Sequence, residues 1–270
     1  MEKDLISVIM AIYNCAPTLP EAIESIINQT VTNWQLILCD DCSTDDTYAV
    51  AKRYADSDKR IKLIKNETHS MLPYSLNHCL ENADGEFIAR MDGDDISVPE
   101  RFEKQIAYLH AHPDCKVVGT AMRRFDGDKL GDIAYCPENP DRYTLHKGLP
   151  FNHATIMMRK ETYDALGGYT VSKRTVRGQD RDLWFRFFHA GFSGNNLMEP
   201  LYMVREDINA IKRRTPYDRF RSYKTTLFGY RLLKYPWYWY IRPTLELSKC
   251  LVPSKAMLAI RRIQAKKSDK

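Results

Sequence analysis

Residues 86–95 read Glu-Phe-Ile-Ala-Arg-Met-Asp-Gly-Asp-Asp, and the interpretation of the whole chain starts from them. Phe87 to Ala89 form a short apolar run that predicts a buried strand. The run leads into Asp92, Asp94 and Asp95, three carboxylates that strand packing does not explain. Two carboxylates around a glycine can turn toward one Mg²⁺ or Mn²⁺, which usually shares its other positions with substrate phosphates. A solvated Asp-Gly turn is the open alternative.

Apolar runs of strand length alternate with helical patterns along the chain. Strands are predicted at 5–10, 36–39, 61–64, 87–89 and 116–119. Helices are predicted at 22–27, through Val50 and Tyr54, at 72–81 and at 99–110. Ser43 or Thr44 is expected to cap the second helix, with Asp45 and Asp46 in its first turn. This alternation predicts an α/β fold, a mostly parallel sheet with helices on both faces.

Polar side chains gather where the predicted strands end. Tyr13 follows the first strand, Asp40 and Asp41 follow the second, and residues 92–95 follow the fourth. Ligands of such sheets bind at the carboxyl ends of the strands. The sequence therefore predicts a site at this edge, built from an aromatic ring and two acidic clusters.

Composition is that of an ordinary globular protein, with 270 residues, 44% of them hydrophobic and 28% charged. No apolar stretch approaches the roughly 18–20 residues of a membrane span, and the first residues are unlike a signal peptide, so we expect a cytoplasmic protein. Seven scattered cysteines fit reduced thiols. Residues 212–270 contain sixteen Lys and Arg but three acidic residues, a net charge of +13 that leaves −8 for residues 1–211.

Four segments in order resemble one enzyme family. They are residues 7–14 (SVIMAIYN), 39–45 (CDDCSTD), 85–95 (GEFIARMDGDD) and 179–184 (QDRDLW). Together they resemble the inverting family 2 glycosyltransferases of the GT-A (Rossmann-like) fold, over residues 5–205 or so. The resemblance implies a sheet of mixed, mostly parallel strands and transfer of a sugar from a UDP-sugar with the help of Mn²⁺ or Mg²⁺.

The resemblance also implies roles for individual residues. Tyr13 would stack on uracil, Asp41 would accept a hydrogen bond from the base, and Asp94 with Asp92 would bind the metal. Asp180 would be the base that deprotonates the acceptor hydroxyl, although an acid at that place can also be an N-cap. The remaining nucleotide-sugar contacts would come from Ala11, Asn14, Asp40, Arg90, Gly93, His153 and Arg177.

The chain departs from many members of this family at Gln179, where glutamate is frequent, and in three further places. Ala11 stands where proline is frequent, Cys42 where glycine is frequent, and residues 66–70 replace a glycine-containing Asn-x-Gly loop. Cys42 also forms a Cys-x-x-Cys with Cys39, which a redox pair or half of a zinc site would use. The other cysteines do not supply the further closely spaced ligands that zinc needs.

The C-terminal segment is predicted to be separate from the catalytic domain. We divide the chain into a GT-A domain, 1–211, and a basic, aromatic helical extension, 212–270. Residues 217–233 are expected to form an amphipathic helix, and residues 235–242 (YPWYWYIR) combine aromatic and basic side chains, as in peripheral membrane proteins at the inner leaflet. Helices wrapping the domain would have the same composition. Nucleic acid is not an expected partner, because no known binding module is present.

These inferences predict a metal-dependent inverting glycosyltransferase of exopolysaccharide or capsule biosynthesis, acting on a growing glycan, with a lipid-diphosphate-linked acceptor. The alternative is a membrane-associated relative that acts mainly by binding proteins, through the tail or the surface around residues 212–214. A nucleotidyltransferase would need a glycine-rich phosphate loop, which is absent. The sequence predicts neither the donor sugar nor the oligomeric state.

Overall fold

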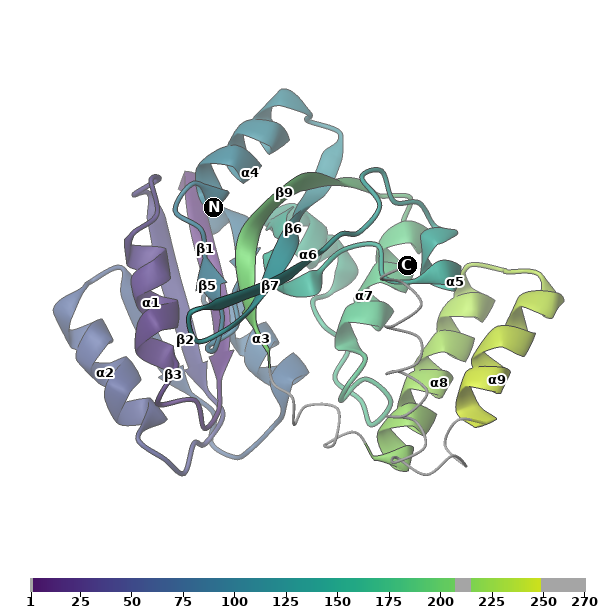
Figure 1. Cartoon of the computed structure of the whole chain (residues 1–270), viewed down its shortest axis with the longest axis horizontal. Coiled ribbons are helices and arrows are strands. Elements are labelled where there is room, and N and C mark those ends of the chain that lie inside the picture. The colour runs from purple at the N-terminus through teal and green to yellow at the C-terminus, as the bar shows by residue number, and fades with distance from the viewer. Residues whose placement is uncertain (1, 207–214, 249–270) are drawn as a thin grey trace.

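The computed structural model describes residues 2–206 and 215–248, which form a curled sheet covered by helices (Figure 1). In the described residues the sheet has nine strands in the order β3-β2-β1-β4-β8-β6-β9-β5, with β7 beside β6. The strands β3, β2, β1 and β4 are parallel, and β8 is antiparallel to both of its neighbours. The predicted α/β fold, with a mixed and mostly parallel sheet, is confirmed.

The first half of the chain follows the predicted alternation. Its elements are β1 (Glu2–Ile12), α1 (Leu19–Ile27), β2 (Trp34–Asp40), α2 (Thr47–Ser57), β3 (Ile61–Lys65), α3 (Leu72–Glu81) and β4 (Gly85–Arg90). Residues 5–10 of β1 are all buried, as expected of a central strand with helices on both faces. Pro20 and Pro73 lie in the first turns of α1 and α3, where a missing N–H costs nothing.

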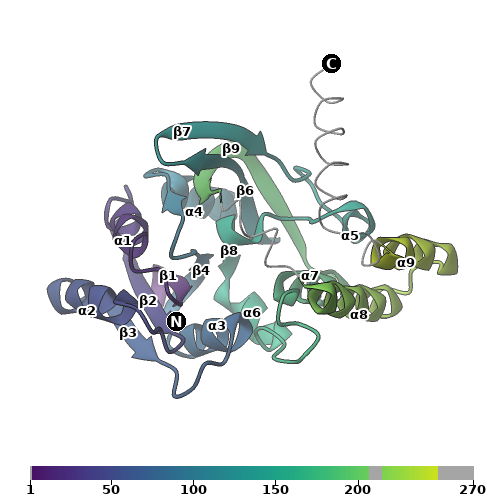
Figure 2. The ribbon, with the colours of Figure 1, turned by 60° about the horizontal axis from the view of Figure 1, so that its bottom comes forward.

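Helices cover both faces of this sheet, as predicted. Ile6, Val8 and Met10 face α1, α2 and α4 (Arg101–Ala111) in one hydrophobic core. Ile9 faces a second core, whose helices are α3, α6 (Lys160–Leu166) and α7 (Gln179–His189). Figure 2 shows the helices on the two sides of the strands. Because successive side chains of β1 point to opposite faces of the sheet, the strand contributes residues to both cores.

The second half adds antiparallel pairs and long strands. Its elements are β5 (Ile96–Ser97), β6 (Cys115–Asp126), β7 (Lys129–Ala134), α5 (Thr144–Lys147), η1 (His153–Thr155), β8 (Met157–Arg159) and β9 (Ser193–Arg205). The predicted strand at 116–119 is the start of β6, which pairs in parallel with β9 through several register shifts. Sequence patterns miss β9, because its exposed and buried residues do not alternate regularly and it contains Pro200.

Two C-terminal helices follow: α8 (Pro216–Leu232) packs beside α7, and α9 (Ile241–Ser248) packs on α8, to which η2 (Trp237–Tyr240) joins it (Figures 1 and 2). A capping box between Thr215 and Asp218 starts α8. A Cβ on Gly229 would meet the Phe185 ring at 2.0 Å, so glycine permits the close approach to α7. The prediction of an amphipathic helix is wrong, because the apolar residues of α8 are spread around it.

Several side chains of the extension pack against the catalytic domain. Tyr230, Leu233 and Tyr235 are buried in the second core, and Trp239 stacks on His146 with ring centroids 4.0 Å apart. The predicted boundary between residues 211 and 212, the surface around 212–214 and the basic tail 249–270 lie outside the described residues. In the part that the structure describes, no helix is long and apolar enough to cross a membrane.

Candidate active site

The loops after β1, β2 and β4 meet at one edge of the sheet. The backbone N–H of Asp41 donates to the Ile12 carbonyl at 3.0 Å, and the Cys15 N–H donates to the Thr47 hydroxyl at 2.8 Å. The Thr18 hydroxyl donates to the Gly93 carbonyl at 3.0 Å. The first loop is thus bonded to both acidic loops, as the strand-end argument predicts. Ala11 is partly buried on β1, where it pairs in register with Cys39 of β2.

Backbone strain is concentrated in these loops. Asn14, Cys42 and Met71 have positive φ angles of 49°, 62° and 70°. Such angles cost an ordinary side chain about 1 kcal/mol or more, and they cluster at functional sites. This conformation accounts for the glycine that the family resemblance leads one to expect at position 42.

Asp40 and Asp41 have different environments. The buried Asp40 carboxylate accepts the Ser43 N–H at 3.3 Å, and the Ser43 hydroxyl accepts the Asn14 N–H at 3.1 Å. Ser43 therefore joins two loops. The predicted cap of α2 by Ser43 or Thr44 is wrong: Asp46 is the N-cap, without a side-chain bond, because the turn at Cys42 delays the start of the helix.

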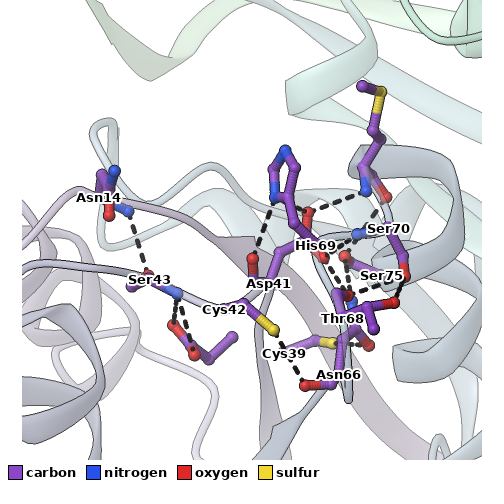
Figure 3. A network of polar contacts seen from close by, with 12 residues as sticks. Asn14, Cys39, Asp41, Cys42, Ser43, Asn66, Thr68, His69, Ser70 and Ser75 are labelled. Carbon is purple, nitrogen blue, oxygen red and sulfur yellow. Dashed lines mark hydrogen bonds and ion pairs between the residues drawn. The ribbon is translucent and has the colours of Figure 1, made fainter.

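The Asp41 carboxylate is held by a dense network (Figure 3). One oxygen accepts the Asn66 side-chain amide at 2.7 Å and the Ser70 N–H at 2.8 Å. The other accepts the Met71 N–H at 2.9 Å and lies 2.9 Å from Nδ1 of His69. The replaced loop, 66–70, thus orients Asp41.

Tyr13 lies half exposed above this network. Its ring stacks on His69, with centroids 4.4 Å apart and planes tilted by 35°. Tyr13 and Asp41, the two residues predicted to bind the nucleobase, therefore both contact His69. Position 69 carried no signal in the sequence, because a lone histidine in a polar loop is usually solvated.

The acidic loop after β4 is only partly neutralised. The buried Arg90 guanidinium binds Asp92 with two bonds of 2.7 and 2.8 Å. Burial and the charges of Asp92 and Asp94 raise the pKa of Asp95 well above its usual range, although Arg205 N–H and the Tyr202 hydroxyl donate to it. The three carboxylates therefore repel one another at close range.

Asp94 is exposed, and among the described residues its carboxylate bonds to no group but its own backbone N–H. Desolvation of the carboxylate by the surrounding loop and the charge of Asp92 raise its pKa. A Cβ at Gly93 would lie 3.1 Å from Cys15 Sγ, so glycine lets the loop pack closely on the β1 end. Arg205, which the sequence did not single out, donates to the Asp94 carbonyl at 2.9 Å.

These residues fit a cation that is bound mainly by substrate. No group of three or more His, Cys, Asp or Glu among residues 2–206 and 215–248 could hold a metal ion alone. Asp94, however, has an unpaired carboxylate with a raised pKa, and a cation would relieve the repulsion. Mg²⁺ is commonly bound by one or two carboxylates together with substrate phosphates and water.

Asp180 lies in the first turn of α7, but it is not the helix cap. Gly178 is the N-cap, and the Asp180 carboxylate accepts only the N–H of its neighbour Arg181 among the described residues. Burial raises the pKa of Tyr169, whose hydroxyl also lies within the fields of Arg90 and Asp180. The charges of Arg90 and Asp180 thus both act on this buried hydroxyl.

Arg177 and His153 differ in exposure. Arg177 is exposed, with its Nε 3.8 Å from an Asp218 carboxylate oxygen. His153 is buried, its Nε2 lies 3.0 Å from the Tyr169 hydroxyl, and its Nδ1 has no described hydrogen-bond partner. Contacts of either residue with a diphosphate stay predictions.

The buried histidine predicts acid sensitivity. Burial, helped by the charge of Arg90, holds the pKa of His153 well below the ordinary 6.5, so it is neutral in the fold and gains a proton on unfolding below that pH. Stability should then fall as the pH drops below about 6.5, by at most about 1.4 kcal/mol per pH unit from this group. Urea unfolding of His153→Gln between pH 7.5 and 5 should show a shallower dependence. His112→Gln, an exposed histidine, should match the wild type, and equal slopes for all three would contradict the assignment.

Cys39 and Cys42 are not joined in a disulfide, and with the described residues they build no metal site. All six described cysteines are free, and Cys39 and Cys42 both contact Asn66. In the described residues no metal-binding cluster includes them. Both cysteines instead bond to Asn66, the residue that donates to the Asp41 carboxylate.

Comparisons with known proteins define the class. The family model "Glycosyl transferase family 2" matches residues 7–167, and the chain belongs to this family. It is a glycosyltransferase with the GT-A fold.

Three known proteins are similar to it over most of its length. "Putative glycosyltransferase EpsE" of Bacillus subtilis (strain 168) is 48% identical over 253 residues, 93% of this chain and 91% of EpsE. "Amylovoran biosynthesis glycosyltransferase AmsE" of Erwinia amylovora is 30% identical over 224 residues, 81% of this chain and 82% of AmsE. The crystal structure of S. aureus TarS 1-349 in complex with UDP-GlcNAc shares the fold at 18% identity, with a TM-score of 0.67 over 91% of this chain and 71% of that chain.

Proposed function

We propose that the protein is a metal-dependent inverting glycosyltransferase that moves a sugar from a UDP-sugar to a growing glycan. The observation that supports this most is the bonding of the β1, β2 and β4 loops into one edge, with Tyr13, Asp41 and Asp94 on it. The acceptor base is assigned to Asp180, on the helix that follows.

Uridine recognition is assigned to Tyr13 and Asp41. An exposed tyrosine ring offers a flat apolar surface on which a base can stack. A carboxylate accepts hydrogen bonds only, so Asp41 suits the imide N–H of uracil. The similar fold of TarS, which was crystallised with UDP-GlcNAc, supports a UDP-sugar donor. Asn14, Asp40 and the backbone around Ala11 shape this end of the site.

Asp94, with Asp92 beside it, is assigned to Mn²⁺ or Mg²⁺. The cation would neutralise the negative charge that develops on the leaving diphosphate. Arg90 holds Asp92 in place through its two bonds and offsets part of the loop's charge. Gly93 keeps the loop close to the β1 end.

Asp180 is assigned to remove the proton from the acceptor hydroxyl. Inversion needs a base on the side of the sugar opposite the diphosphate, as in inverting hydrolysis with the acceptor in place of water. An acid in the first turn of α7, without a role as cap, is available for this. No covalent intermediate is needed.

The acceptor is assigned to the class of exopolysaccharide or capsule precursors, in lipid-diphosphate-linked form. Support comes from AmsE, whose name states amylovoran biosynthesis, at 30% identity over most of both chains.

A UDP-sugar panel tests the function. The purified protein should be stabilised thermally by a subset of UDP-sugars with Mn²⁺, because selective ligands stabilise the folded state by mass action. It should also release UDP from the selected donor. No stabilisation by any UDP-sugar or UDP, and no UDP release, would contradict the function.

We also propose that the extension contacts an anionic membrane. Trp237, Tyr238, Ile241 and Leu245 are all more than half exposed, on η2 and α9. Residues 212–270 have a net charge of +13. Exposed aromatic and aliphatic side chains beside basic residues suit the headgroup region of anionic bilayers.

Replacing Trp237, Ile241 and Leu245 together by Ser is expected to reduce co-sedimentation with anionic vesicles about tenfold or more, because each buried apolar side chain contributes roughly 1 kcal/mol or more. These side chains are exposed, so the fold should persist. A matched control replaces Leu130 of β7 and Tyr135, which follows that strand, by Ser; both are exposed. If the triple variant sediments as well as the wild type, the membrane proposal is wrong.

A further inference from the structure

His69 occupies the place that the proposed function reserves for a nucleobase. Its ring lies against Tyr13, with a centroid distance of 4.4 Å. Its Nδ1 lies 2.9 Å from the Asp41 carboxylate and 3.1 Å from the Asp41 carbonyl. A flat nitrogen heterocycle that stacks on the tyrosine and bonds to the aspartate is the arrangement expected of a bound uracil.

Asp41 has no acceptor position left for a base while His69 is bound. A carboxylate offers about four lone-pair positions, and Asn66, Ser70, Met71 and His69 use them. The first three donors are a buried amide and two backbone N–H groups, which form part of the loop. His69 is a side chain that remains 46% exposed.

The His69 side chain is also the donor that can leave most easily. In the part of the chain that the structure describes, its contacts are the Tyr13 ring and the two Asp41 oxygens. Rotating it outward breaks these contacts and leaves the other three Asp41 bonds unchanged. The ring face of Tyr13 and one Asp41 carboxylate oxygen then become available together. Figure 3 shows His69 beside Asp41.

We propose that His69 fills the base position in the unliganded protein and that the uracil ring of UDP displaces it. This inference rests on the proposed function, because it requires that Tyr13 and Asp41 bind the base. His69 then lowers nucleotide affinity by competing for the same two partners. It also keeps the Asp41 carboxylate fully hydrogen-bonded when no donor is present, which avoids an unsatisfied buried acceptor.

Replacing His69 by Ala removes the competitor. UDP should bind about three- to tenfold more tightly in the presence of Mn²⁺, because a competing hydrogen bond and ring contact of ordinary strength no longer have to be broken. Pyrophosphate, which lacks the base, should bind His69→Ala and the wild type equally. His69→Ser is expected to give the same gain as His69→Ala. Isothermal titration calorimetry measures all of these constants.

His112→Ala is the matched control. His112 also stacks on a tyrosine, Tyr108, at 4.1 Å and bonds a backbone carbonyl through Nδ1, but it lies after α4 and belongs to no assigned site. Unchanged or weaker UDP binding in both His69 variants, or an equal gain for pyrophosphate, would overturn the inference alone. Absence of UDP binding in the wild type and all variants would overturn the proposed function and the inference with it.

Discussion

Replacing Asp180 by Asn should lower kcat for sugar transfer by about a thousandfold, because general base catalysis of this kind contributes roughly 10²–10⁴ in rate. The amide cannot accept the proton of the acceptor hydroxyl. Binding of UDP should change by less than about twofold, since Asp180 is assigned to the acceptor side and not to the nucleotide. The measurement pairs the initial rate of transfer with a UDP titration of the same preparation.

Asp164→Asn is the control for Asp180→Asn. Asp164 is an exposed carboxylate on α6 that pairs with Lys160, so its replacement should leave transfer unchanged. The fold of the Asp180 variant should persist, because within residues 2–206 and 215–248 the carboxylate accepts only its neighbour's N–H. Near-normal turnover of Asp180→Asn would remove the base assignment, and loss of UDP binding would place the residue in the donor site.

Replacing Asp94 by Ala should lower kcat/KM for the donor by about a thousandfold at fixed Mn²⁺, because a cation that neutralises a leaving diphosphate contributes several kcal/mol. UDP affinity should also fall, and adding Mn²⁺ should no longer improve it. Fold stability should not fall, since the carboxylate repels Asp92 and is bonded only to its own backbone among described residues.

The chain contains its own control for this variant. Asp126-Gly127-Asp128 repeats the Asp-Gly-Asp of residues 92–94 in the exposed turn between β6 and β7. Asp128→Ala removes the carboxylate that corresponds to Asp94 in this second Asp-Gly-Asp. No residue assigned to the active site adjoins Asp128 in the sequence, so activity and Mn²⁺ dependence should be unchanged. If Asp94→Ala keeps its Mn²⁺ response, Asp94 is not the metal ligand.

Much of the fold could be predicted because the parallel strands are short, buried and separated by helices with regular apolar spacing. Residues 5–10 and 36–39 could hardly form anything but central strands, and Asp41 and Asp92 then had to follow strand ends. Because β1, β2 and β4 are parallel neighbours, their carboxyl ends lie at the same edge of the sheet, and the loops that follow them could be predicted to meet. The structure confirms these loops as neighbours.

Other features depend on tertiary contacts that leave no local pattern. β9 is irregular, because bulges shift its register against β6. The start of α2 was misplaced because Cys42 adopts a left-handed conformation that its sequence does not announce. His69 and Arg205 were missed for the same reason, since each gains its role only from a partner on another loop.

Calorimetric titration of the wild-type protein with UDP, in Mn²⁺ and in EDTA, tests most directly whether the strand-end loops form a cation-assisted nucleotide site. We expect saturable 1:1 binding in Mn²⁺ that weakens about tenfold or more in EDTA, because Asp94 would hold the cation that neutralises the diphosphate. Equal affinity in the two buffers would contradict the role of the cation. No UDP binding in either buffer would contradict the assignment of the site.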